Sequence, residues 1–137
     1  MTFVLDASVA GNWFIPDEAQ HPNALHAWER IRADNALVPM HFWFEIRNVL
    51  LDGERRRRFT DRHTELVLNR MAAIRIVFAP LENDSEILAL ARRHRLSLYD
   101  AAYLELAKRQ GFPLATLDGD LIEAARAEAV PLVTAPA

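Results

Sequence analysis

The sequence predicts an α/β domain with a central, mostly parallel sheet of four to five short strands flanked by helices. Short β-prone apolar runs, about four residues each, alternate with longer segments whose apolar residues recur at helical spacing. Near-continuous apolar strands are typical of a sheet that is covered on both faces. The alternation therefore indicates layers of helix, sheet and helix.

The bulk properties suit one soluble domain covering residues 1–137. Of the 137 residues, 51% are hydrophobic and 26% are charged, which is ordinary for a globular protein. No apolar run approaches the roughly 20 residues of a membrane span, and the first residues show no secretory signal. The chain has no cysteine, which excludes disulfides and thiolate metal sites. We therefore expect a cytoplasmic protein that does not enter a membrane.

The first section of the chain is expected to fold as a strand and two helices. Residues 2–5 are apolar and too few for a helix, and a helix begins after Asp6 and ends before Pro16. A second helix begins at His21-Pro22 and runs to about residue 33. Its expected buried stripe consists of residues three positions apart: Leu25, Trp28 and Ile31.

The middle section is expected to contain a strand and two long helices. Residues 36–39 form the second strand, which ends at a proline. One helix runs from about residue 41 to 56 and the next from residue 60 to 73. Thr60 is a candidate N-cap for the latter, and Asp61 suits its first turn.

The last section alternates strands with helices. The expected strands are 75–78, 114–117 and a weaker one at 130–133, where Pro131 favours a sheet edge. The expected helices are 83–94, 99–110 and 121–127, of which the second ends at Gly111. The first of these helices is expected to bury one side, consisting of Ile87, Leu88, Leu90 and Ala91.

Two acids follow strands of similar sequence. Phe3-Val4-Leu5-Asp6 and Ala115-Thr116-Leu117-Asp118 are built alike. If the two strands are neighbours, their terminal carboxylates emerge side by side at the carboxyl edge, where such sheets bind ligands. Taken singly, Asp6 and Asp118 are better explained as helix N-caps.

Two further acids lie on helices. Asp100 fits a capping box with Ser97, but its apolar neighbours argue against a freely solvated carboxylate. Glu45 stands in the most hydrophobic part of its helix. It belongs to a polar stripe with His41, Asn48 and Asp52, which faces either solvent or a polar pocket, and we favour the pocket.

The four acids gain meaning if they converge. Asp6, Glu45, Asp100 and Asp118, with Asp120 close by, would place four or five negative charges in one cleft, which is unfavourable without protons or a cation. Mg²⁺ is the natural partner of carboxylate oxygens. A magnesium site of this kind suits phosphoryl chemistry, in which the metal orients the phosphate and generates hydroxide.

Four segments, taken in their order along the chain, resemble PIN-domain ribonucleases, specifically the VapC toxins of bacterial toxin–antitoxin pairs. The segments are Val4-Leu5-Asp6-Ala7-Ser8-Val9, Glu45-Ile46-Arg47-Asn48-Val49-Leu50, Leu98-Tyr99-Asp100-Ala101-Ala102-Tyr103 and Ala115-Thr116-Leu117-Asp118-Gly119-Asp120-Leu121. The resemblance implies a three-layer PIN-like fold and Mg²⁺- or Mn²⁺-dependent endonucleolytic cleavage of RNA. It also implies a homodimer and a VapB-like antitoxin whose C-terminal segment enters the active-site groove.

The resemblance also implies roles for individual residues. The family's acidic metal ligands would fall on Asp6, Glu45, Asp100 and Asp118, with Asp120 as an auxiliary acid. We expect the three aspartates Asp6, Asp100 and Asp118 to hold the ion directly, while Glu45 and Asp120 bind it or position the attacking water. The residues implied to support the site are Ser8, Asn48 and Thr116. Many relatives have a longer or basic residue near Asn12, so no role is assigned there. Whether one or two ions act stays open.

A run of four arginines is the strongest local charge feature: Arg55, Arg56, Arg57 and Arg58. Arginine suits bidentate contacts to an RNA backbone. A solvated cationic helix end that complements the helix dipole is at least as good an explanation.

Two other enzyme classes with this architecture fit less well. A haloacid-dehalogenase-type phosphatase needs a second acid two residues after Asp6, where Ser8 stands, and a response-regulator receiver needs a late sheet lysine, whereas Lys108 lies within an expected helix. The alternative from another class is a catalytically silent PIN-like module that binds RNA or a protein.

Overall fold

The computed structural model describes residues 2–80 and 83–137. Within them the elements follow one another in the order β1 (Phe3–Leu5), α1 (Ala7–Phe14), α2 (Pro22–Ile31), β2 (Ala36–Val38), α3 (Phe42–Arg55), α4 (Asp61–Ala72), β3 (Ile76–Phe78), α5 (Asp84–His94), α6 (Leu98–Gln110), β4 (Leu114–Ala115) and α7 (Gly119–Ala127). The predicted alternation of strands and helices is confirmed. None of these helices combines the length and apolar character needed to cross a bilayer.

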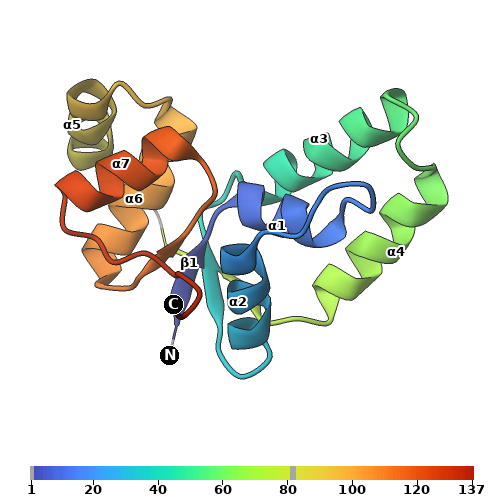
Figure 1. Cartoon of the computed structure of the whole chain (residues 1–137). Helices are drawn as coiled ribbons and strands as arrows, with labels where there is room; N and C mark the ends of the chain where they lie inside the picture. Colours follow the sequence, from blue (N-terminus) through green and yellow to red (C-terminus); the bar gives the residue numbers. More distant parts are fainter. Residues whose placement is uncertain (1, 81–82) are drawn as a thin grey trace.

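The four strands form one parallel sheet in the order β3-β2-β1-β4. The chain moves outward from β1 through β2 to β3, then returns to place β4 on the free side of β1, where Leu5 pairs with Ala115. Figure 1 shows α5, α6 and α7 on one side of the sheet and α1 to α4 on the other. The switch in strand order therefore lies between β1 and β4.

The core surrounds β1, whose three residues are completely buried. Helix α6 has a continuous buried stretch, residues 101–107. Gly111 ends it in the left-handed region, at φ 71°, as the sequence predicts. An acid carried by α6 therefore lies next to the core rather than in open solvent.

Three local predictions were correct only in part. The side of α2 that is buried consists of Ala24, Ala27 and Ile31, whereas Leu25 is 40% exposed, because the two alanines let the helix backbone approach its neighbours. On α5, Leu88 is 41% exposed and lies at the edge of the buried side. Thr60 precedes α4, but its side chain makes no capping hydrogen bond.

The end of the sheet also differs from the prediction. Strand β4 stops at Ala115, because the next residues turn away to bond with the start of α1. The fifth strand expected at 130–133 is reduced to a single parallel bridge between Leu132 and Leu114. Pro131 has no N–H to donate, which limits pairing in that segment.

Candidate active site

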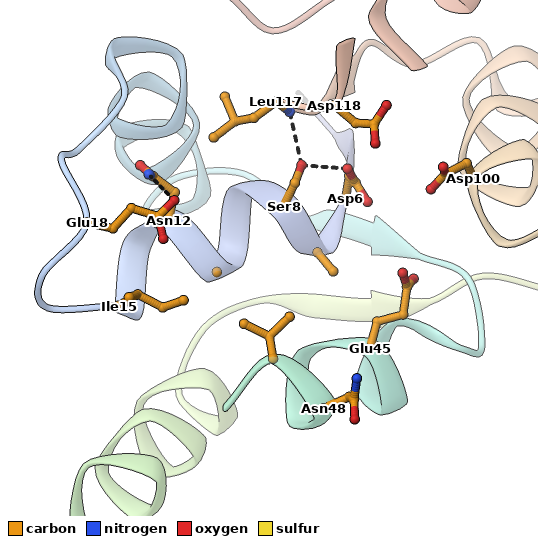
Figure 2. A pocket seen from close by; sticks show the side chains of 13 residues that line it. Asp6, Ser8, Asn12, Ile15, Glu18, Glu45, Asn48, Asp100, Leu117 and Asp118 are labelled. Carbon is orange, nitrogen blue, oxygen red and sulfur yellow. Dashed lines mark hydrogen bonds between the residues drawn. The ribbon is translucent and has the colours of Figure 1, made fainter. Parts of the chain in front are cut away.

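The carboxyl edge of β1 and β4 opens into a pocket of about 470 Å³. Its lining includes four predicted acids and two predicted supporting residues: Asp6, Glu45, Asp100, Asp118, Ser8 and Asn48. The acids come from four different parts of the fold, at the ends of β1 and β4 and on α3 and α6. Figure 2 shows the carboxyl groups of Asp6, Glu45 and Asp100 facing the same space.

Asp6 is the most enclosed of these acids, at 4% exposure. One of its carboxylate oxygens accepts hydrogen bonds from the hydroxyls of Ser8 (2.6 Å) and Thr116 (2.7 Å). Burial raises the pKa of Asp6 from 3.8 to about 6, with smaller contributions from the charges of Glu45 and Asp100, and the two hydroxyls oppose this rise. Asp6 occupies the N-cap position of α1 without a side-chain capping bond, so the capping interpretation does not explain its carboxyl group.

Ser8 and Thr116 join the start of α1 to the end of β4. The Ser8 hydroxyl accepts from the backbone N–H of Leu117 at 3.0 Å, and the Thr116 hydroxyl accepts from that of Asp118 at 3.1 Å. Both hydroxyls donate to Asp6. The bonds from Ser8 to Asp6 and Leu117 are drawn in Figure 2. The pair therefore fixes Asp6 and aligns the segment that carries Asp118.

Asp118 and Asp100 combine capping with a place in the pocket. Asp118 Oδ1 accepts from the backbone N–H of Leu121 at 3.0 Å and so caps α7. At the start of α6, the Ser97 hydroxyl accepts from the backbone N–H of Asp100 at 3.1 Å. Burial, followed by the charges of Asp118 and Glu45, raises the pKa of Asp100. The Asp118 carboxyl therefore both caps a helix and lines the pocket, whereas the Asp100 carboxyl lines the pocket while the Ser97 hydroxyl caps its helix.

Glu45 is held from the far side of the pocket. The Tyr103 hydroxyl donates to Glu45 Oε1 at 2.7 Å, and His41 Nε2 lies 3.1 Å from the same oxygen. Burial and the charges of Asp6 and Glu45 raise the pKa of Tyr103 far above its ordinary value, so its hydroxyl stays protonated. Sequence reasoning assigned Tyr103 no role, because an apolar helix face explains its position equally well.

The predicted polar stripe of α3 faces the pocket only in part. Glu45 and Asn48 line it, whereas His41 lines a neighbouring pocket together with Tyr99. Asp52 is exposed and pairs with Arg56 at 3.0 Å, because the helix has by then run past the pocket. Asp120 is exposed in the first turn of α7 and does not line the pocket.

The loop between α1 and α2 forms a wall that the sequence did not predict. Glu18 adds a further acid to the pocket lining. Asn12 holds the loop from inside: its Nδ2 donates to the Ala19 carbonyl at 3.1 Å, and its Oδ1 accepts from the His21 N–H at 2.9 Å. A buried asparagine in an apolar helix was the available signal for this role.

The arginine run is partly occupied within the chain. The Arg58 guanidinium donates hydrogen bonds of 2.7 to 3.1 Å to the carboxylate of Asp17, which lies in the loop between α1 and α2. Arg56 forms the ion pair with Asp52. Arg57 stands in the turn after α3 at φ 58°. Arg58 therefore fastens the pocket wall from outside.

The donor set of the pocket fits a hard divalent cation, since it is rich in carboxylates, and burial, with smaller contributions from neighbouring negative charges, raises the pKa of Asp6 and Asp100. In the part of the chain that the structure describes, however, no group of three or more acidic or histidine side chains is gathered closely enough to hold one ion. Binding would require the carboxylates to turn inward.

Comparisons with known proteins agree with this architecture. A family model for the PIN domain matches residues 3–127. Similar solved structures are PAE2754 from Pyrobaculum aerophilum (TM-score 0.63, 20% identity, 90% of this chain and 84% of that one), a toxin–antitoxin complex from Klebsiella pneumoniae (0.56, 18%, 85% and 86%) and FitAcB from Neisseria gonorrhoeae (0.53, 16%, 98% and 97%). At these identities the likeness shows the fold. A comparison with curated proteins gave no match.

Proposed function

The chain belongs to the PIN domain family, and from this premise we propose that it is a metal-dependent endoribonuclease acting as the toxin of a toxin–antitoxin pair. The observation that carries the proposal is the convergence of Asp6, Glu45, Asp100 and Asp118 on one pocket at the switch in strand order. Acids from four separate elements have no shared structural purpose there. Together they suit a cation that acts on a phosphodiester.

In the proposed site, Asp6, Asp100 and Asp118 would hold Mg²⁺ or Mn²⁺, with Asp120 as an auxiliary acid. When bound, the ion would neutralise charge at the phosphate and lower the pKa of a water molecule in the pocket. Ser8 and Thr116 keep Asp6 fixed, so its carboxylate needs little rearrangement. The lining residues do not decide between one ion and two.

Glu45 is proposed to orient the attacking water. Tyr103 engages its Oε1, which leaves Oε2 to accept a proton from a water in the pocket. The water oxygen attacks phosphorus in line, the bond from phosphorus to the leaving oxygen breaks, and that oxygen takes up a proton. Asn48 lines the same wall one helical turn further on and supports the approach of the substrate.

The proposal extends to partners. An acidic pocket open to solvent suits a basic segment of a VapB-like antitoxin, which would compete with RNA for the groove. Exposed apolar residues on α3 and just before it, Phe44 and Met40, support a homodimer. Arg55 and Arg57 are the members of the arginine run proposed to contact the RNA backbone. The RNA substrate implies a cytoplasmic protein.

The decisive experiment is incubation of total RNA with the purified chain and Mg²⁺, with and without chelator, followed by mapping of the cut ends. Cleavage should require the ion and disappear in Asp100→Asn. The matched control is Asp52→Asn, which removes an exposed acid outside the pocket lining and should cleave normally. RNA binding without cleavage under all conditions would favour the silent binding module instead.

A further inference from the structure

Tyr103 is a completely buried tyrosine whose hydroxyl points at an acid of the pocket. It lies in the middle of α6, and its oxygen is 2.7 Å from Glu45 Oε1 on α3. The chain has only one other tyrosine, Tyr99, which is 61% exposed. The two side chains are chemically identical, but only Tyr103 is buried and bonded to Glu45. They therefore form a matched pair for comparison.

A hydrogen bond from the Tyr103 hydroxyl holds the Glu45 carboxylate at the pocket wall. His41 Nε2 also lies near Glu45 Oε1, but it is buried and forms no hydrogen bond of good geometry within the described residues. The His41 ring instead packs edge-on against both tyrosines, with centroids 5.1 Å from Tyr103 and 5.3 Å from Tyr99. It fills space beside the bond rather than replacing it.

A structural role alone does not account for this contact. A phenylalanine would fill the same volume in α6 without bringing a polar atom into the core, where a hydroxyl costs free energy unless it is bonded. The bond that satisfies the hydroxyl is made to a carboxylate that also lines the pocket. In Figure 2 the Glu45 carboxyl group points toward the side on which Asp6 and Asp100 lie.

We propose that Tyr103 is a positioning residue for Glu45: its hydroxyl holds Oε1 at the pocket wall and thereby directs Oε2 toward Asp6 and Asp100. This inference rests on the proposed function, in which Glu45 orients the attacking water. Without the hydroxyl, the Glu45 side chain regains rotamers that point toward solvent. Substrate contacts are made elsewhere, so turnover should suffer and RNA binding should not.

The test compares Tyr103→Phe with the matched control Tyr99→Phe, each alone and in a Glu45→Gln background. For the RNA that the unaltered chain cleaves, Tyr103→Phe should lower kcat by about 10- to 100-fold, the range typical of residues that orient groups at a metal site. KM should change by less than about threefold. Tyr99→Phe should leave both constants unchanged, and in the Glu45→Gln background Tyr103→Phe should cost nothing further.

A second measurement does not depend on cleavage. Calorimetric titration with Mn²⁺ alone should show weaker binding for Tyr103→Phe, in the direction of Glu45→Gln and no further, while Tyr99→Phe binds as the unaltered chain does. Circular dichroism should show the same folded spectrum for all variants. If Tyr103→Phe does not fold, Glu45→Asp, which is too short to reach the hydroxyl, should reproduce the loss of kcat and of Mn²⁺ affinity.

The outcomes separate the two proposals. Unchanged kcat and Mn²⁺ affinity in Tyr103→Phe, with kcat measurably lowered in Glu45→Gln, would overturn the positioning role and leave the proposed function standing. A further loss in the Glu45→Gln background would also overturn it, because Tyr103 would then act independently. If the unaltered chain binds Mn²⁺ but cleaves no RNA, the proposed function fails, and the Mn²⁺ titrations still decide whether Tyr103 positions Glu45.

Discussion

Replacing Asp6 by asparagine should stabilise the metal-free protein near neutral pH while abolishing cleavage. Burial raises the pKa of Asp6 from 3.8 to about 6. At about 1.4 kcal/mol for each pH unit, ionising this carboxyl in the metal-free fold costs about 3 kcal/mol. Asparagine keeps an oxygen to accept from Ser8 and Thr116 and carries no charge. Allowing for imperfect bonding of its amide, we expect a gain of roughly 1 to 3 kcal/mol at pH 7.5.

The gain should depend on pH in a defined window. Because the folded pKa of Asp6 lies above the unfolded one, the folded chain holds this proton more tightly. The stability that this residue contributes is therefore present below about pH 3.8 and is lost as the pH rises through about 6. The difference in unfolding free energy between Asp6→Asn and the unaltered chain should be small at pH 4, grow up to neutral pH and then stay constant.

Urea titrations with a chelator, followed by circular dichroism from pH 4 to 8, measure this difference. Asp52→Asn serves as the control, since it removes an exposed acid outside the pocket lining. Mg²⁺ added without chelator should stabilise the unaltered chain and not Asp6→Asn, because binding to the folded state alone raises its stability. A difference that does not change with pH, or an Asp6→Asn protein that is less stable at pH 7.5, would refute the reasoning.

Three further predictions concern other parts of the structure. Asp100→Asn should abolish cleavage without lowering the metal-free unfolding free energy, because its capping contact uses the backbone N–H, which the substitution retains; a loss above about 1 kcal/mol in urea titrations would show a structural role for the carboxylate instead. Glu128→Gln should lower the unfolding free energy at pH 7 by about 2 to 3 kcal/mol with cleavage retained, since three basic side chains lower the pKa of Glu128 from 4.5 to about 2. That stabilisation is present above pH 4.5 and lost as the pH falls toward 2, so the effect of the substitution should vanish in acid. Gly53→Ala should destabilise the α3–α4 turn by about 1 to 3 kcal/mol, because its Cβ would collide with the Phe59 ring, whereas Gly119→Ala meets no atom within 4 Å and should unfold at the same temperature as the unaltered chain.

The sequence was sufficient for the order and type of the helices and strands, because local patterns set them. Short apolar runs gave the strands, three of them with a proline close to one end, and a glycine after an apolar helix gave the end of α6. The sequence predicted less well which side of each helix is buried. Leu25 and Leu88 are as apolar as their buried neighbours, and only the partner surface decides that Ala24 or Ile87 faces inward.

The sequence predicted that Asp6 and Asp118 lie side by side if their strands are neighbours, and these two strands do pair in the sheet. Contacts between distant segments were not predictable in the same way. The bond from Tyr103 to Glu45 joins positions 58 residues apart, and the loop carrying Glu18 reaches the pocket through the hold of Asn12 and Arg58. No local pattern encodes such distances, so these residues became visible only in three dimensions.

The wide separation of the acids along the chain also governs when the site exists. The bond between Asp6 and Thr116 joins residues 110 positions apart, across the pairing of β1 with β4. Closing so long a loop comes late in folding, because its entropic cost must be met before its contacts form. On the ribosome, the acids of the pocket therefore do not come together until the residues around Asp118 have been synthesised and β4 has paired with β1. Under the proposed function, the nuclease becomes active only after this part of the chain has been synthesised and folded. Partly synthesised or partly unfolded chains therefore do not cleave the surrounding RNA.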